Sequence, residues 1–417
     1  MATALRVLVL GILLLLIIKA AREGIAAYYL KQNTPEAVEK AMAWDPADPV
    51  YPATAANLIH LYSENPSPQR VVSLYQRAVK LSPFDAVYCA DLAQAEEWAG
   101  RPEIAAAYYQ QALELFPKSP EINWKVANFS VRSGNTDAAL PLLRNVLSSG
   151  VISHDQVFAL TARARLEPAR VIENVLPDDA ATIGDYLNFQ VDRGDSPAAS
   201  LAWDRLLRLR SSFEIYRTFH YLDWLIKSHE IDRATQAWAS VVARFPALVP
   251  DPASSTNLVT NGDFKTEPVN GGFDWLSHPV AGATVSYERF GGTGTGNSSA
   301  LRIDFDGTQN LYYDGMAQFI PVEPNEKYEF SVRERVTGIT TESGVAMQIL
   351  DAYDPRKVLG ATKPMLGTAP WQEEKFSFTA ERNTRLVLLT VLRKRSDKLD
   401  GKIAGSVWFR NAVLHQE

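Results

Sequence analysis

The chain has 417 residues, of which 46% are hydrophobic and 22% charged, so it is long enough for two or three globular domains. Its formal net charge of −6 argues against a nucleic-acid partner, because such a partner favours a basic surface. The single cysteine, Cys89, excludes an internal disulfide framework and any cysteine-based metal cluster.

An apolar run opens the chain, from Val7 to Ile18, between Arg6 and Lys19. Such a run gains several kcal/mol on entering lipid. It predicts a membrane anchor helix over residues 1–24 of a single-pass protein in the bacterial inner membrane, with the bulk of the chain in the periplasm. A cleaved signal peptide is the alternative, but Lys19 follows the apolar run directly and no small-x-small cleavage site follows it, which favours an uncleaved anchor.

A set of residues recurs at a spacing of 34 after this segment. Tyr75, Ala78, Leu81, Pro83 and Gly100 recur as Tyr109, Ala112, Leu115, Pro117 and Gly134. This period indicates stacked helix–turn–helix repeats, in which each helical pair buries its apolar faces against its neighbours.

These residues resemble the tetratricopeptide repeat family, and we expect such repeats over 25–153. The match weakens toward 153, where Val151 stands in place of the expected proline. The resemblance implies that the first helix of each pair lines a groove that binds a protein partner. By position, the predicted groove residues are His60, Gln94, Glu97, Trp124 and Asn128. Trp124 has an alternative role, which is packing against the next repeat.

A weaker echo follows over 154–246, where Tyr186, Leu187 and Trp203 recur 35 residues later as Tyr221, Leu222 and Trp238. It predicts degenerate helical repeats that continue the same solenoid. A proline-rich linker at 247–256 then ends the helices.

Short runs of alternating apolar and polar residues fill 257–417, with glycine, proline, asparagine and aspartate between them. This pattern predicts an antiparallel β-sandwich or jelly roll. The predicted fold class is therefore a multidomain α and β chain: an N-terminal transmembrane helix, an all-α solenoid and a C-terminal antiparallel β-sandwich.

The segments 257–264, 299–303 and 407–414 resemble the carbohydrate-binding, galactose-binding-like jelly rolls. Phe264, Trp275, Trp371 and Trp408 occupy positions that the resemblance assigns to the core. Lys265 and Arg410 stand where family members carry acidic residues for a structural calcium. Because calcium requires oxygen ligands, we expect no metal site here.

A glycan site needs aromatic platforms and polar groups that fix orientation. The predicted glycan-binding residues are Tyr287, Tyr312, Tyr313, Arg333 and Gln348, the last two on polar faces of strands that look adjacent. Ordinary edge packing is the alternative for Tyr312 and Tyr313. The basic segment 393–398 either meets acidic groups or is simply solvated.

Catalytic patterns are weak. Asp304 with Asp306 and Asp351 with Asp354 fit turn or strand-edge positions, the six histidines lack metal-binding spacing, and the glycine-rich segment 291–296 fits a flexible turn. The sequence therefore predicts a non-catalytic envelope scaffold without a cofactor. It would bind a protein in the groove and glycan on the sandwich, in polysaccharide assembly or export. A purely structural docking adaptor and an undetected glycoside hydrolase are the alternatives.

Overall fold

The computed structural model describes residues 2–249, 256–290, 298–399 and 401–417. It separates into two compact units, Met1–Asp178 and Asp179–Glu417. Most of the predicted linker, at 250–255, and the predicted glycine-rich turn at 291–296 lie outside the described residues.

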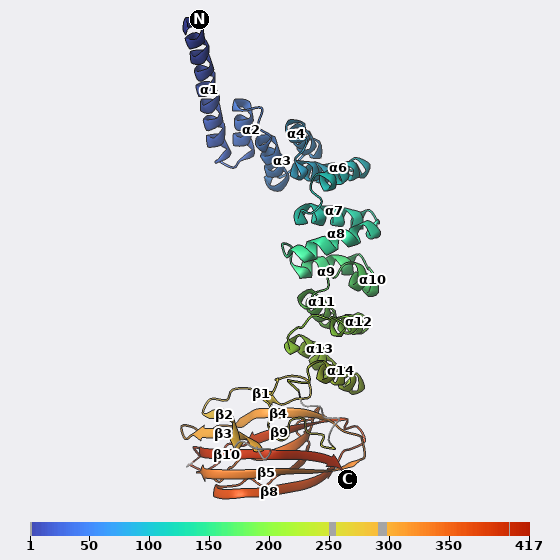
Figure 1. The fold of residues 1–417 in the computed structure, drawn as a ribbon, viewed down its shortest axis with the longest axis vertical. Helices are drawn as coiled ribbons and strands as arrows, with labels where there is room; N and C mark the ends of the chain where they lie inside the picture. The colour runs from blue at the N-terminus through green and yellow to red at the C-terminus, as the bar shows by residue number, and fades with distance from the viewer. Residues whose placement is uncertain (1, 250–255, 291–297, 400) are drawn as a thin grey trace. The chain divides into compact units, whose positions relative to one another are not determined.

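The first unit is built from helices, most of them in antiparallel pairs. They are α1 (Ala2–Leu30), α2 (Pro35–Trp44), α3 (Val50–Tyr62), α4 (Pro68–Leu81), α5 (Ala86–Trp98), α6 (Pro102–Leu115), α7 (Pro120–Arg132), α8 (Thr136–Ser149), α9 (His154–Arg163) and α10 (Pro168–Asn174) (Figure 1). The side chains of Ser67, Asp85 and Ser119 accept hydrogen bonds from backbone amides of the first turns of α4, α5 and α7.

Alanines at the recurring positions explain why the helices of this unit pack closely. Ala78, Ala90, Ala93, Ala105 and Ala112 are fully or almost fully buried. Side chains this small let helix axes approach, and the larger Tyr75 and Tyr109 fill the space between them. The predicted helical solenoid is confirmed.

The predicted membrane anchor over 1–24 is not supported. Among the residues whose side chains are described, no helix is long and apolar enough to cross a membrane.

The second unit begins with helices and continues into strands. Its helices are α11 (Ala180–Asp192), α12 (Ser196–Leu207), the short 3₁₀ helix η1 (Ile215–Thr218), α13 (Phe219–Lys227) and α14 (Ile231–Arg244). The 35-residue echo arises because its aromatic residues belong to the core. Those that are buried are Tyr186, Trp203, Tyr221 and Trp238. The ring centroids of Trp203 and Tyr221 lie 4.8 Å apart.

Two five-stranded antiparallel sheets follow, in the orders β1-β4-β9-β6-β7 and β2-β3-β10-β5-β8 (Figure 1). The strands are β1 (Leu276–Ser277), β2 (Ala283–Phe290), β3 (Ser298–Asp306), β4 (Tyr313–Pro321), β5 (Lys327–Ile339), β6 (Ala346–Asp351), β7 (Val358–Ala361), β8 (Gly367–Thr379), β9 (Leu386–Arg393) and β10 (Ala404–Gln416). Alternate residues of both sheets, such as Val332, Met347 and Phe409, enter one shared core. The predicted β-sandwich is confirmed.

The aromatic residues assigned to the core divide into two pairs. Phe264 and Trp275 are buried in the core with ring centroids 5.2 Å apart, as predicted. Trp371 and Trp408 lie outside the cluster between the two sheets: Trp408 is nonetheless buried, at 6% exposure, whereas Trp371 is only half-buried. Successive side chains of a strand face opposite ways, so Trp408 points outward because Phe409 points inward.

The hairpin α13–α14 packs directly against the sandwich within the second unit. The Tyr353 hydroxyl donates a hydrogen bond of 2.5 Å to the Ile226 carbonyl. A Cβ atom built at Gly271 would lie 2.4 Å from the Phe219 ring, and one at Gly272 would lie 2.4 Å from the Trp238 ring. The two glycines therefore let aromatic rings of the hairpin rest on the backbone of the β region.

Replacing Gly272 with alanine is expected to destabilise the second unit by about 2–4 kcal/mol. The new methyl group would collide with Trp238, and the residue has φ +60°, which disfavours a side chain. Gly338→Ala is the matched control, since Gly338 has φ +68° with no atom within 4 Å of a built Cβ. Urea unfolding of the full chain should show a larger loss for Gly272→Ala, and equal losses would contradict the packing argument.

Candidate functional site

A groove of about 1000 Å³ lies along the first helices of three successive pairs, α3, α5 and α7. Most of its lining comes from these helices, with a smaller contribution from α4. The lining residues are Asn57, His60, Leu61, Val71, Tyr75, Val87, Asp91, Gln94, Ala95, Glu97, Trp98, Ser119, Glu121, Lys125 and Arg132.

Exposed apolar side chains form part of this groove. Leu61 is 60% exposed, Val87 52% and Trp98 38%. The His60 ring stands edge-on to Trp98, with centroids 4.6 Å apart and an interplanar angle of 71°. Helices of a soluble solenoid normally turn such residues inward, so their gathering in one concavity marks a surface suited to an apolar partner.

Two ion pairs connect α5 with α7 at the edge of the groove. Lys125 pairs with Asp91, and the Arg132 guanidinium donates two hydrogen bonds of 2.8 Å to the two oxygens of Glu97. The hydrogen bond with Glu97 raises the pKa of Arg132. Because the partners are 34 and 35 residues apart, each pair joins nearly equivalent positions of adjacent repeats. The charges at the groove edge are therefore held in place.

Three of the five predicted groove residues line this concavity: His60, Gln94 and Glu97. Trp124 and Asn128 are half-buried and do not line it. The Asn128 side-chain amide donates a 2.8 Å hydrogen bond to the Trp124 carbonyl.

Sequence reasoning missed several lining residues, among them Leu61, Trp98, Lys125 and Arg132. Lys125 was detectable, because it lies one 34-residue period after Asp91 with the opposite charge. The exposed Leu61 was harder to find, since a leucine on a helix is usually placed in the core.

The three predicted glycan-binding tyrosines have different environments. Tyr313 is fully buried, with its ring edge-on to Phe305 at 5.7 Å, so its side chain is not available to a ligand. Tyr287 is half-buried against the core, and this burial raises its pKa to about 12. Only Tyr312 is well exposed, at 46%.

Arg333 and Gln348 do not come together either. Arg333 lies on β5 and Gln348 on β6, which are consecutive in the chain but belong to different sheets. Their neighbours Val332 and Met347 enter the core, so both predicted residues face outward, on opposite sides of the sandwich. The five predicted residues therefore form no common surface.

The predicted basic loop begins with a buried residue. Arg393 is fully buried at the end of β9. Its guanidinium donates hydrogen bonds to Asn310, Leu311, Thr341, Ser343 and Gly401. Arg393 therefore fastens three loops together and is not part of a binding surface, whereas Lys394 and Arg395 are exposed.

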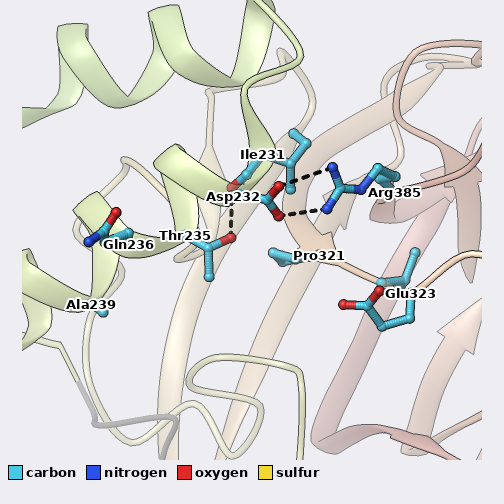
Figure 2. Close-up of a pocket in the computed structure, with 9 residues that line it drawn as sticks. Ile231, Asp232, Thr235, Gln236, Ala239, Pro321, Glu323 and Arg385 are labelled. Atoms are coloured by element: carbon cyan, nitrogen blue, oxygen red, sulfur yellow. Dashed lines mark hydrogen bonds and ion pairs between the residues drawn. The ribbon is translucent and has the colours of Figure 1, made fainter.

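A smaller pocket of about 370 Å³ lies within the second unit, between α14 and the segment 321–323 (Figure 2). Arg385 donates hydrogen bonds of 2.6 and 3.2 Å to the two carboxylate oxygens of Asp232. The Thr235 hydroxyl donates a 2.9 Å hydrogen bond to the Ile231 carbonyl. Because these polar groups already have hydrogen-bond partners in the protein, the pocket is better explained as a gap in the packing of α14 against the β region than as a ligand site.

The acidic pairs noted in the sequence are engaged in local contacts. Asp304 accepts hydrogen bonds from Arg302 and Ser406, and Asp306 accepts two from Thr308, from its backbone amide and its hydroxyl. Asp351 accepts a 2.6 Å hydrogen bond from Thr384. Among the described residues, no group of three or more histidine, cysteine, aspartate or glutamate side chains is placed to hold a metal ion.

Residues 88–129, which run from α5 into α7, match the tetratricopeptide repeat family model. The protein therefore contains a tetratricopeptide repeat at the centre of the groove. No curated protein matches the chain.

Several solved structures are similar to parts of the chain. One is described as "CBM4 structure and function" (18% identity, 38% of this chain and 99% of that chain, TM-score 0.27). Another is PilF of Pseudomonas aeruginosa (13% identity, 55% and 92%, TM-score 0.28). A third is YrrB, described as a tetratricopeptide repeat protein with an unusual peptide-binding site (13% identity, 51% and 94%, TM-score 0.26). Sequence identities and TM-scores this low are no basis for assigning the fold or the function of these proteins to this chain.

Proposed function

We propose that this protein is a non-catalytic scaffold whose groove on α3, α5 and α7 binds an apolar segment of a protein partner. The observation that carries the proposal is the exposure of Leu61, Val87 and Trp98 within one concavity. Burying such side chains stabilises a complex by roughly 25 cal/mol for each Å² of apolar surface removed from water. An aromatic residue surrounded by apolar neighbours is a typical centre of a protein interface.

The fixed charges support binding of a segment in one orientation. Asp91–Lys125 and Glu97–Arg132 span neighbouring helices, so their side chains lose little further freedom when a partner arrives. Rim charges of this kind select partners and orient them more than they add affinity.

A groove variant tests the proposal. Peptides selected from a random phage-displayed library on the full-length protein are expected to bind Leu61→Asp at least tenfold more weakly, because a carboxylate would enter the apolar concavity. The matched control is Leu201→Asp, which changes an exposed leucine on α12. Fluorescence anisotropy with the selected peptides measures both variants. Unchanged affinity in Leu61→Asp, or an equal loss in the control, would contradict the groove assignment.

We further propose that the β-sandwich holds glycan during polysaccharide assembly or export, with the groove and the sandwich in the bacterial periplasm. The half-exposed Trp371 lies against Arg410, and the guanidinium groups of Arg302 and Arg335 cover Trp408. Together they support a glycan surface on the sheet β2-β3-β10-β5-β8. The accessibility of this protein to protease added to spheroplasts tests the periplasmic location.

The two rival roles predict other results. A purely structural adaptor would not be retained by any polysaccharide, and a glycoside hydrolase would release reducing ends from one.

A further inference from the structure

The outward face of the sheet β2-β3-β10-β5-β8 carries a row of arginines around an indole ring. Trp408 on β10 lies opposite Arg302 on β3 and opposite Arg335 on β5. The guanidinium carbons lie 5.0 and 4.7 Å from the ring centroid. Trp408 is only 6% exposed, so the two guanidinium groups, and not the indole, form the surface here.

A second group of two arginines and a tryptophan lies beside the first on the same face of the sheet. Arg410 on β10 lies opposite Arg333 on β5, and its guanidinium carbon is 4.2 Å from the Trp371 ring centroid. Burial, and then the neighbouring charge of Arg333, lower the pKa of Arg410. Like charges directly opposite each other on adjacent strands are destabilising.

The acidic residues on this face are largely committed to other partners. Arg302 pairs with Asp304 at 2.9 Å and lies 3.8 Å from Glu288, which also accepts the Trp408 indole hydrogen bond. Glu373 lies opposite Arg333 in the sheet but forms its ion pair with Lys375 at 3.4 Å. Within the described part of the chain, neither Arg333 nor Arg335 has an ion pair, so both guanidinium groups can pair with a ligand.

We propose that this face binds an acidic polysaccharide, with Arg333 and Arg335 pairing with carboxylate groups on its sugars. The inference rests on the proposed glycan-holding role and names the class of glycan. Arg333 and Arg335 share a strand face, which sets them about 7 Å apart, and adjacent strands lie about 5 Å apart. A polymer with a carboxylate on successive sugars presents a comparable row of charges.

The chemistry of the guanidinium group favours carboxylates. Its planar fork of donors matches the two oxygens of a carboxylate, and stacking on an indole holds the fork in place before a ligand arrives. Trp371 remains half-exposed beside Arg410, so a sugar ring can pack against its edge while the carboxylates pair. A neutral glycan would offer no anionic partner to Arg333 and Arg335.

Affinity electrophoresis of the full-length protein in gels with polygalacturonate or its fully methyl-esterified form tests the inference. Wild-type protein should be retarded by the acidic polymer at least tenfold more strongly than by the ester, and added salt should weaken the retardation. The double substitution Arg333→Gln/Arg335→Gln should reduce binding to the acidic polymer about tenfold or more. Arg382→Gln, at an exposed arginine outside this face, is the matched control and should bind as wild type.

The possible outcomes separate the inference from the proposed function. Equal retardation by both polymers, unchanged in the double variant, overturns the acidic specificity but keeps the glycan role. No retardation by any polysaccharide overturns both. Equal binding to polyglutamate would show a general anion surface and contradict the choice of a polysaccharide. If the double variant fails to fold, the comparison of acid and ester on wild-type protein still decides the specificity.

Discussion

Replacing Arg393 with methionine is expected to destabilise the β-sandwich by about 3–5 kcal/mol, one of the two largest effects predicted for a single side chain. Arg393 is fully buried and donates to five residues, three of them through backbone carbonyls. Methionine fills a similar volume but donates no hydrogen bond, so those acceptors would be buried without partners. Urea unfolding followed by tryptophan fluorescence measures the loss.

The matched control for this prediction lies two residues away. Arg395 is exposed, and its change to methionine should alter the free energy of unfolding by less than about 0.5 kcal/mol. Arg393→Lys should remain strongly destabilising, because one ammonium group cannot reach acceptors arranged around a planar guanidinium. A mild effect of either Arg393 substitution would mean that the three loops are held by other contacts.

Replacing Glu334 with glutamine is expected to stabilise the protein above neutral pH and to flatten the pH dependence of its stability. Glu334 points from β5 into the sandwich and is fully buried. Neither of its carboxylate oxygens has a hydrogen-bond partner among the described residues. Burial, and then the charge of Glu374, raise the pKa of Glu334 to about 8, while the nearby Met365 backbone amide acts in the opposite direction.

The direction of the pH effect follows from this raised pKa. The folded protein holds a proton on Glu334 that the unfolded chain releases near pH 4.5. The stabilisation is therefore fully present below about pH 4.5 and is lost as pH rises through about 8. A difference of one between the folded and unfolded pKa values corresponds to roughly 1.4 kcal/mol, so the total loss is a few kcal/mol.

Urea unfolding between pH 5 and pH 9 tests this prediction. Wild-type stability should fall across the range through Glu334, and Glu334→Gln should remove that part of the slope. Glu329→Gln is the matched control, because Glu329 lies on the outward face of the same strand and is partly exposed. An identical pH slope in wild type and Glu334→Gln would show that the carboxyl group is already ionised in the folded protein.

Periodicity explains which parts of the fold could be predicted. The 34-residue echo reports contacts between neighbouring repeats, so Tyr75 and Tyr109 were correctly assigned to the packing of a solenoid. Alternation along Tyr328–Val332 likewise showed a strand with one buried face. Both signals can be found within one stretch of sequence. Alternation compares residues two apart, and the echo compares residues one repeat apart.

The binding residues were harder to predict because they depend on which strands become neighbours. Alternation shows that Arg333 and Gln348 face outward but cannot show that β5 and β6 enter different sheets. Strand parity, by contrast, limits which residues of one strand can enter the core. Adjacent residues of a strand face opposite ways, so Trp408 and Phe409 could not both enter the core.

The seating of α13 and α14 on the sandwich has a mechanical consequence. Phe219 and Trp238 rest on the bare backbone of Gly271 and Gly272, and Tyr353 ties the β region to the end of α13. A pull on a polymer held by the sandwich would therefore reach the hairpin through side-chain contact as well as through the covalent chain. The β region would then transmit the force directly to the helices on which it is packed.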